Sequence, residues 1–95
     1  MKFIIDNKMY NLEVRENVDK VFGKLFKKDK VSFEYINKKI KEIRENPYHF
    51  KPLRAPFQNY RRVHIGNFVL IYSINENTKT VIIEKYKHHD EAYKV

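Results

Sequence analysis

The sequence predicts a single α+β domain in which one strand is followed by two helices and then by a three-stranded antiparallel meander. Three observations predict this class. Apolar and polar residues alternate near the N-terminus, apolar residues recur at helical spacing between residues 18 and 43, and alternation returns after residue 60. A chain of 95 residues is long enough for one domain, spanning residues 1–95, and too short for two.

The N-terminal segment, residues 2–14 (KFIIDNKMYNLEV), is expected to form one strand, or a small hairpin that turns at residues 6–8. Asn17 is the expected N-cap of a first helix, because its side chain can accept a backbone N–H of the first turn. The charged run at residues 27–30 ends that helix. Its apolar positions are Val18, Val21, Phe22, Leu25 and Phe26.

A second helix is expected to start at Ser32 as its cap and to stop at Asn46-Pro47, because proline cannot continue a helix and restricts the residue before it. Two helices of similar length with a short basic connection predict an antiparallel helical hairpin. The apolar stripe of this second helix consists of Phe33, Ile36, Ile40 and Ile43.

Three strands are expected at residues 60–65, 68–74 and 80–87, with turns at Gly66-Asn67 and at residues 75–77. The helices should cover one face of the resulting sheet and leave the other face open for binding or catalysis.

The charge balance points to an anionic partner. Lys plus Arg outnumber Asp plus Glu by 20 to 12, for a net charge of +8, and no Asp or Glu occurs between Asn46 and Asn75. Such a stretch lacks carboxylates that would repel a phosphate, so nucleic acid is the expected partner and an acidic protein the alternative. The absence of cysteine excludes disulfides, and no apolar run approaches the roughly 20 residues of a membrane span, so a cytoplasmic protein is expected.

Two basic segments are candidates for phosphate binding. In a strand, Arg62 and His64 point to the same face, where a cation beside a titratable ring could hold a phosphate. The alternative is an ordinary solvated sheet face. Lys51 and Arg54 flank a short apolar pair and could position a nucleic-acid backbone without reading its sequence.

The C-terminal stretch contains His88, His89 and Asp90, followed by Tyr93. Adjacent strand residues point to opposite faces, so both rings are not expected to bind one ion, and neither a metal site nor another cofactor is predicted. A histidine pair can instead supply a general acid and a general base near neutral pH. The phenol of Tyr93 could stack on a base or donate to a phosphate.

The stretches NPYHFKPL, YRRVHIGNFVLIYSI and IIEKYKHHDEAY resemble the RelE/ParE superfamily of toxins from type II toxin–antitoxin systems, and in particular its RelE-like branch. The resemblance covers roughly residues 10–93 and implies the RelE-like fold. It also implies a ribosome-dependent, metal-independent mRNA endonuclease that inhibits translation from the ribosomal A site. In that reaction the 2′-hydroxyl of the mRNA attacks the adjacent phosphate and yields a cyclic phosphate.

By this resemblance the catalytic residues are Arg62, His64, His88, His89 and Tyr93. A second group would bind the RNA phosphates, and it consists of Lys51, Arg54, Arg61 and Lys87. Val69 departs from the family pattern, because an Arg that often holds the scissile phosphate usually stands there. Arg54, Arg61 or Arg62 would then take its place.

The resemblance further implies a cognate RelB-like antitoxin, a toxin–antitoxin heterotetramer, and contact with the ribosome and mRNA. Two other functions stay open. One is a ParE-like gyrase inhibitor that acts by binding, against which His64, His88 and His89 argue. The other is a catalytically weak toxin homologue that acts as a binding partner, for which Val69 argues.

Overall fold

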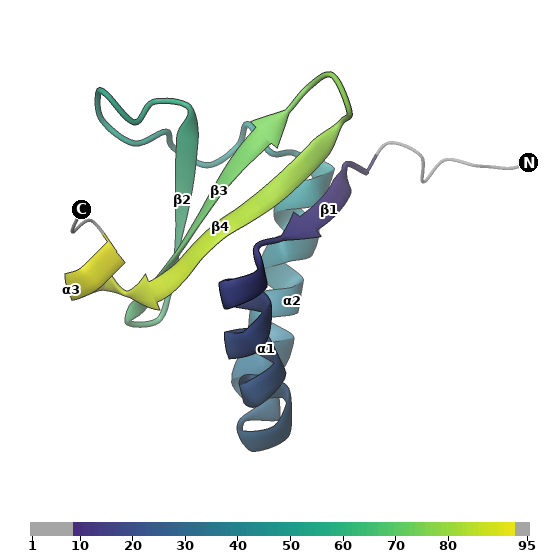
Figure 1. Cartoon of the computed structure of the whole chain (residues 1–95), viewed down its shortest axis with the longest axis vertical. Coiled ribbons are helices and arrows are strands. Elements are labelled where there is room, and N and C mark those ends of the chain that lie inside the picture. The colour runs from purple at the N-terminus through teal and green to yellow at the C-terminus, as the bar shows by residue number, and fades with distance from the viewer. Residues whose placement is uncertain (1–8, 93–95) are drawn as a thin grey trace, which may run out of the picture.

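The computed structural model describes residues 9–92, which fold as one open sheet packed against a helical hairpin (Figure 1). The order of elements confirms the predicted α+β class. No helix in this part of the chain combines the length and the apolar character needed to cross a membrane. The elements are β1 (Asn11–Val14), α1 (Glu16–Lys28), α2 (Lys30–Glu45), β2 (Tyr60–Ile65), β3 (Phe68–Asn75), β4 (Thr80–His88) and α3 (His89–Ala92).

The four strands are arranged in the order β1-β4-β3-β2. β2, β3 and β4 form the predicted antiparallel meander, and β1 pairs in parallel with β4 at the edge. The N-terminal strand prediction is thus confirmed for residues 11–14, and the alternative hairpin turn at residues 6–8 lies outside the described residues. This topology leaves β3 and β4 in the centre of the sheet.

Both helices begin earlier than their predicted caps. α1 starts after Arg15, whose backbone carbonyl accepts the N–H groups of Val18 and Asp19, so the Asn17 cap prediction is wrong. The guanidinium of Arg15 pairs with Glu84 of β4 at 3.0 Å, at the point where β1 ends and the helix starts. A tertiary contact of this kind has no counterpart in local sequence.

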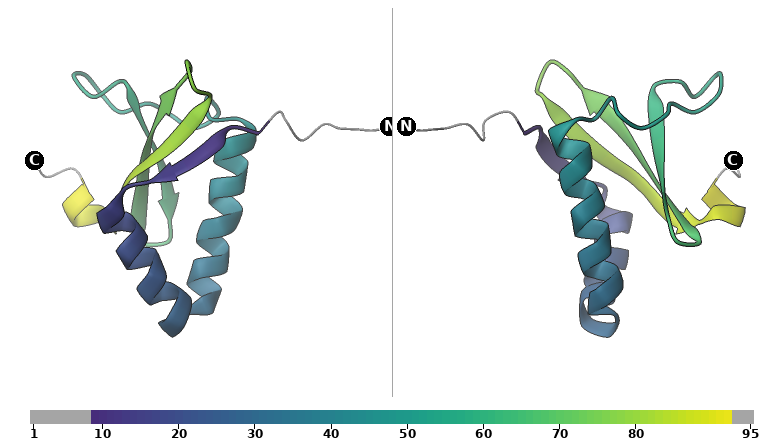
Figure 2. Two further views of the ribbon diagram at one scale, coloured as in Figure 1. Left: turned by 45° about the vertical axis from the view of Figure 1, so that its right-hand side comes forward. Right: turned by 180° about the vertical axis from the view of Figure 1, so that it is seen from behind.

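The cap of α2 is Asp29 rather than Ser32. The Asp29 carboxylate accepts the backbone N–H of Ser32 at 3.1 Å and its hydroxyl at 2.7 Å, and these bonds lower the pKa of Asp29. Ser32 therefore lies inside the first turn of the helix. Because Asp29 alone separates the helices, α1 and α2 fold back on each other as the predicted hairpin (Figure 2).

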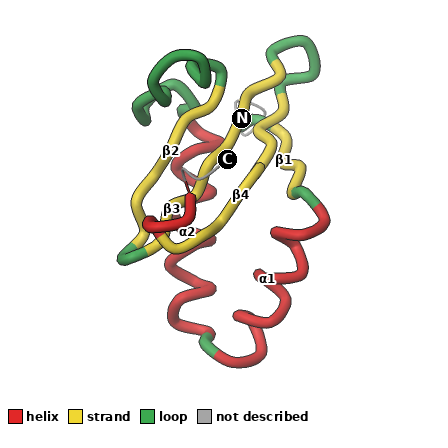
Figure 3. The backbone as a smooth tube through the Cα atoms, turned by 60° about the vertical axis from the view of Figure 1, so that its left-hand side comes forward, coloured by secondary structure: helices red, strands yellow, loops and turns green. Residues whose placement is uncertain are grey.

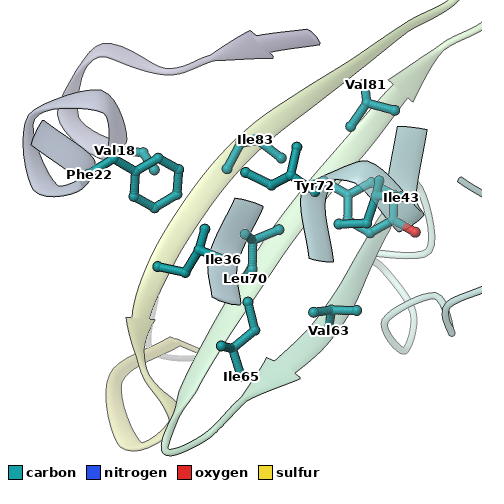
Figure 4. Packing of buried hydrophobic residues seen from close by; sticks show 11 residues of the cluster. Val18, Phe22, Ile36, Ile43, Val63, Ile65, Leu70, Tyr72, Val81 and Ile83 are labelled. Carbon is teal, nitrogen blue, oxygen red and sulfur yellow. The ribbon is translucent and has the colours of Figure 1, made fainter. Parts of the chain in front are cut away.

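The hydrophobic core lies between the helical hairpin and one face of the sheet (Figure 4). At its centre Tyr72 is fully buried, and its hydroxyl donates to the carbonyl of Pro47 at 2.6 Å. Burial raises the pKa of Tyr72 to about 12. The core consists of Val18, Phe22, Ile36, Ile40 and Ile43 from the helices and Val63, Ile65, Leu70, Tyr72, Val81 and Ile83 from the sheet.

A β-bulge in β4 decides which of its residues face the helices. Tyr72 pairs with Ile83 but Ile71 pairs with Lys85, so Glu84 is an extra residue in the ladder. After the bulge it is Tyr86 that turns toward the helices, where its ring meets Phe22 edge-on at 5.5 Å. The residues on either side of Tyr86 consequently point to the opposite face.

Candidate functional site

The face of the sheet away from α1 and α2 is here called the open face. Its central part has an apolar floor with basic residues on both sides, as the strand register and the alternation of side chains require. The floor packs against Leu53 and Tyr60 in a cluster separate from the main core. The side chains of this part are Arg62 and His64 from β2, Val69 and Ile71 from β3, and Lys85 and Lys87 from β4.

These side chains form two rows across the sheet. Arg62 lies opposite Ile71, which lies opposite Lys85. His64 lies opposite Val69 in the same way, and beyond it is Lys87. The ends of a row are about 10 Å apart because each strand step is about 4.8 Å, and the two rows are roughly 7 Å apart along the strands. A grid of this size matches an extended anionic chain better than a single small ion.

Lys85 is a part of this face that sequence reasoning missed. Regular alternation from Val81 and Ile83 would turn residue 85 toward the helices, and only the bulge turns it to the open face. A signal was present nonetheless. The order VIIEKYKH changes its apolar spacing from two to three between Ile83 and Tyr86, which is the pattern that a bulge produces.

Two carboxylates of the strands also lie on the open face, Glu13 of β1 and Glu84 of β4, and both pair with Arg15. Glu84 accepts the hydroxyl of Ser73 at 2.7 Å and the Nε of Arg15 at 3.0 Å, with its side chain only 18% exposed. The bond to Glu84 raises the pKa of Arg15. Because Glu84 is satisfied by these partners, it does not cancel the charge of the neighbouring lysine.

The loop before β2 borders the open face at one end. The backbone N–H of Arg62 donates to the carbonyl of Lys51 at 3.2 Å, and that of Leu53 donates to Tyr60 at 2.9 Å. The loop therefore runs back along β2, and Lys51 and Arg54 remain exposed in it. Their predicted place beside the basic strand is compatible with this geometry.

Arg61 does not share the open face with Arg62. The alternation of β2 points it to the same side as Val63, and its guanidinium donates to the carbonyls of Phe50 at 2.6 Å and Tyr48 at 3.3 Å. It also lies over the Tyr48 ring, 5.1 Å from the centroid. That Arg61 binds RNA phosphate stays a prediction, and in the structure its guanidinium is bound to these loop carbonyls.

The C-terminal part reaches the same end of the sheet as His64, because Phe68 pairs with Ile65 on one side and with His88 on the other. The N–H of His89 donates to the carbonyl of Asn67 at 2.9 Å, and α3 starts there. The views in Figures 1–3 place α3 on the side of the sheet away from the helical hairpin, next to the β2–β3 turn. The open face thus has α3 at one end.

The rings of the two adjacent histidines lie close together, although strand alternation predicted that they point to opposite faces. His88 is the last residue of β4 and meets Phe68 edge-on at 5.6 Å, on the side of the sheet that carries Tyr86. His89 is the first residue of α3, so strand alternation no longer applies to it. The ring centroids are 4.8 Å apart. Tyr93 lies outside the described residues.

The structure therefore places Arg62, His64 and Lys87 on one face of the sheet, and it places His89 at the border of the same face. His88 turns to the other side of β4.

Known proteins share this arrangement of a strand, a helical hairpin and a meander. A family model described as the ParE toxin of the type II toxin–antitoxin system parDE matches residues 12–93.

The chain belongs to the RelE/ParE superfamily of type II toxin–antitoxin toxins. A Methanocaldococcus jannaschii protein that carries the toxin name RelE4 is 46% identical to this toxin over 87 residues, which cover 90% of this chain and 93% of that protein.

Two solved structures show that the RelE fold is shared. The free Escherichia coli toxin RelE, in a variant with two arginines replaced by alanine, has a TM-score of 0.72 at 20% identity and covers 88% of this chain and 87% of its own. RelE in the RelE–RelB complex of Pyrococcus horikoshii has a TM-score of 0.65 at 19% identity, with 88% and 99% covered.

Proposed function

We propose that this toxin is a ribosome-dependent mRNA endonuclease that inhibits translation. The observation that carries the proposal is the open face, where cationic side chains stand on both sides of an apolar floor and an imidazole occupies one corner. Such a face can hold the sugar–phosphate backbone of a single strand and stabilise added negative charge on one phosphate. The family likeness supports the same activity.

In the proposed reaction the 2′-oxygen of one nucleotide bonds to the adjacent phosphorus, and the bond to the 5′-oxygen of the next nucleotide breaks. A general base takes the proton of the 2′-hydroxyl, and a general acid protonates the leaving oxygen, so the products are a cyclic phosphate and a 5′-hydroxyl. The cation of Arg62, with Lys85 and Lys87, would stabilise the phosphorane. No metal is required by this chemistry.

His64 and His89 are the proposed acid–base pair. His64 stands on the open face, and His89 stands at its border where α3 begins, so each can approach the phosphate from its own side. His88 and Tyr93 stay in the proposed catalytic set in a supporting role, as do Lys51 and Arg54 for RNA binding. Val69 stands where family members usually have an arginine that holds the scissile phosphate, and it is fully buried in the floor. Arg62 is therefore the residue proposed to hold that phosphate.

The test is to add the toxin to a translation extract and map the 5′ ends of mRNA on stalled ribosomes. Alanine at His64 or at His89 should reduce cleavage by roughly 100-fold or more, the usual contribution of a general acid or base. His49→Ala is the matched control, since His49 is exposed and lies outside β2 and α3. Undiminished cleavage in both His64→Ala and His89→Ala would remove the assignment.

A ParE-like gyrase inhibitor is the second candidate, favoured by the match to the ParE family model. This function needs binding alone, and a supercoiling assay separates it from the first. Inhibition of gyrase together with intact mRNA would establish it in place of the nuclease.

The proposed protein partner is a RelB-like antitoxin. The Pyrococcus horikoshii structure holds RelE with RelB, and a net charge of +8 favours an acidic partner. A toxin–antitoxin heterotetramer in the cytoplasm, where ribosomes are found, is the proposed resting form. Co-expression with an acidic antitoxin from the same operon should abolish toxicity, and sedimentation of the pair measures its stoichiometry.

A further inference from the structure

We propose that His88, His89 and Asp90 form a binding site for a transition-metal cation of the Zn²⁺ type. One ligand atom from each residue lies within 4.8 Å of the other two. Imidazole nitrogens and a carboxylate oxygen are donors that Zn²⁺ takes, with water able to complete the tetrahedron.

The spacing of the donors suits such an ion. With metal bonds of about 2.0–2.1 Å, tetrahedral donors lie about 3.3 Å apart. One oxygen of the Asp90 carboxylate, Oδ2, lies 3.5 Å from Nδ1 of His88, and the other, Oδ1, lies 3.1 Å from Nε2 of His89. The ligand atoms of the two imidazoles lie within 4.8 Å of each other, and a bound ion would draw them closer through rotation of the His89 side chain, which is 53% exposed.

The backbone holds the three residues in this arrangement. β4 ends at His88, whose ring rests edge-on against Phe68, and the chain turns at once because the N–H of His89 donates to Asn67. The N–H of Asp90 donates to Nδ1 of His88 at 3.3 Å. That nitrogen is therefore an unprotonated acceptor, and a metal bound there would replace the Asp90 N–H as the partner of its single lone pair.

The orientation of the neighbouring lysine limits its repulsion of a cation bound at His88. The nearest lysine in sequence, Lys87, points to the open face by strand alternation, whereas His88 points to the other side of β4. Asp90 contributes the negative charge that favours a divalent ion. The histidines that looked unable to converge in a strand thus converge because the strand ends between them.

A consequence of the site, which rests on the proposed function, concerns RNA cleavage. A bound Zn²⁺ occupies the imidazole lone pair of His89 that proton transfer requires. Zinc should therefore inhibit cleavage by the toxin, and removal of zinc should restore it.

Calorimetry of the untagged full chain with Zn²⁺, and with Mg²⁺ as the comparison, tests the site directly. One Zn²⁺ should bind per chain and Mg²⁺ should not compete with it. Alanine at His88 or His89 should weaken zinc binding by at least about tenfold. Loss of a residue that only contacts a metal ligand already has an effect of about this size, and loss of a ligand itself should have no smaller one. His49→Ala is the matched control and should bind as the unchanged chain does.

A second measurement needs no variant. In the NMR spectrum of the histidine rings, addition of Zn²⁺ should shift the signals of His88 and His89 and leave those of His49 and His64 in place. Absence of saturable zinc binding, or zinc-induced shifts confined to His49 and His64, overturns the proposal.

The two proposals fail separately in this design. Zinc binding by a chain that cuts no mRNA keeps the metal site and removes the nuclease. Cleavage by a chain that binds no zinc keeps the nuclease and removes the site. Cleavage that persists in a chain saturated with zinc removes the inhibitory role alone.

Discussion

The position of Lys85 on the open face can be tested through the salt dependence of RNA binding. Lys85 reaches this face only because of the β4 bulge, opposite Ile71 and across the floor from Arg62. Lys85→Gln removes one positive charge and keeps most of the length of the side chain. The side chain is exposed, so the substitution should leave the fold unchanged.

The expected magnitude follows from the number of phosphate contacts. For a single strand, each neutralised phosphate contributes about 0.7 to the slope of log K against log salt. Arg62, Lys85 and Lys87 together should therefore contribute a slope of about −2, and the variant should lose about 0.7 of it. Affinity itself should fall by a few-fold, as expected for one exposed charge contact of about 0.2–1 kcal/mol.

The assay is fluorescence anisotropy of a short unstructured RNA titrated at several KCl concentrations. Lys41→Gln is the matched control, because Lys41 lies on α2 and pairs with Glu45 at 3.8 Å. It changes the net charge equally and should keep the full slope. An unchanged slope for Lys85→Gln, or an equal loss in both variants, would show that the bulge does not place a phosphate contact.

Three further outcomes are expected in thermal unfolding. Tyr72→Phe leaves the buried Pro47 carbonyl without its donor, which should cost about 1–3 kcal/mol and several degrees of melting temperature, and an unchanged value would contradict that role. Hydrogen bonds from Lys79 and two tyrosines lower the pKa of Glu76 to about 2. Its contribution to stability is thus complete above its unfolded pKa and lost as the pH falls toward 2. Glu76→Gln should therefore make the melting temperature fall less steeply as the pH is lowered. An equally steep fall in the variant and the unchanged chain would argue against this role. Replacement of Gly66, whose φ is 62°, by Ala should lower the free energy of unfolding by about 1 kcal/mol. Replacement by Asn, which tolerates that conformation, should lower it less, and equal losses in the two variants would point to another cause.

Most of the fold was predictable because its elements carry clear periodicity. The strand bounds for β2 match the prediction at both ends, and the helical hairpin and the meander follow in the predicted order. The errors occur at helix starts. Asn17 has the right chemistry for a cap, but α1 starts after Arg15, whose side chain pairs with Glu84, a residue distant in sequence.

The candidate site was predictable in part. Arg62 and His64 share a face because the side-chain period of a strand is two, and that rule needs no structure. Arg61 looks equivalent to its neighbour in the sequence, whereas in the structure its guanidinium donates to the loop carbonyl of Phe50. Lys85 was missed because one extra residue in β4 reverses the alternation.

The sequence by itself determined the α+β class, the order of elements, the basic character of the second half, and the pair at positions 62 and 64. Local periodicity and composition carry that information. Only the tertiary structure decided which basic residues share the open face and how the two terminal histidines meet. Those outcomes depend on where strands pair, bulge and end, and these points are set by contacts between residues far apart in the chain.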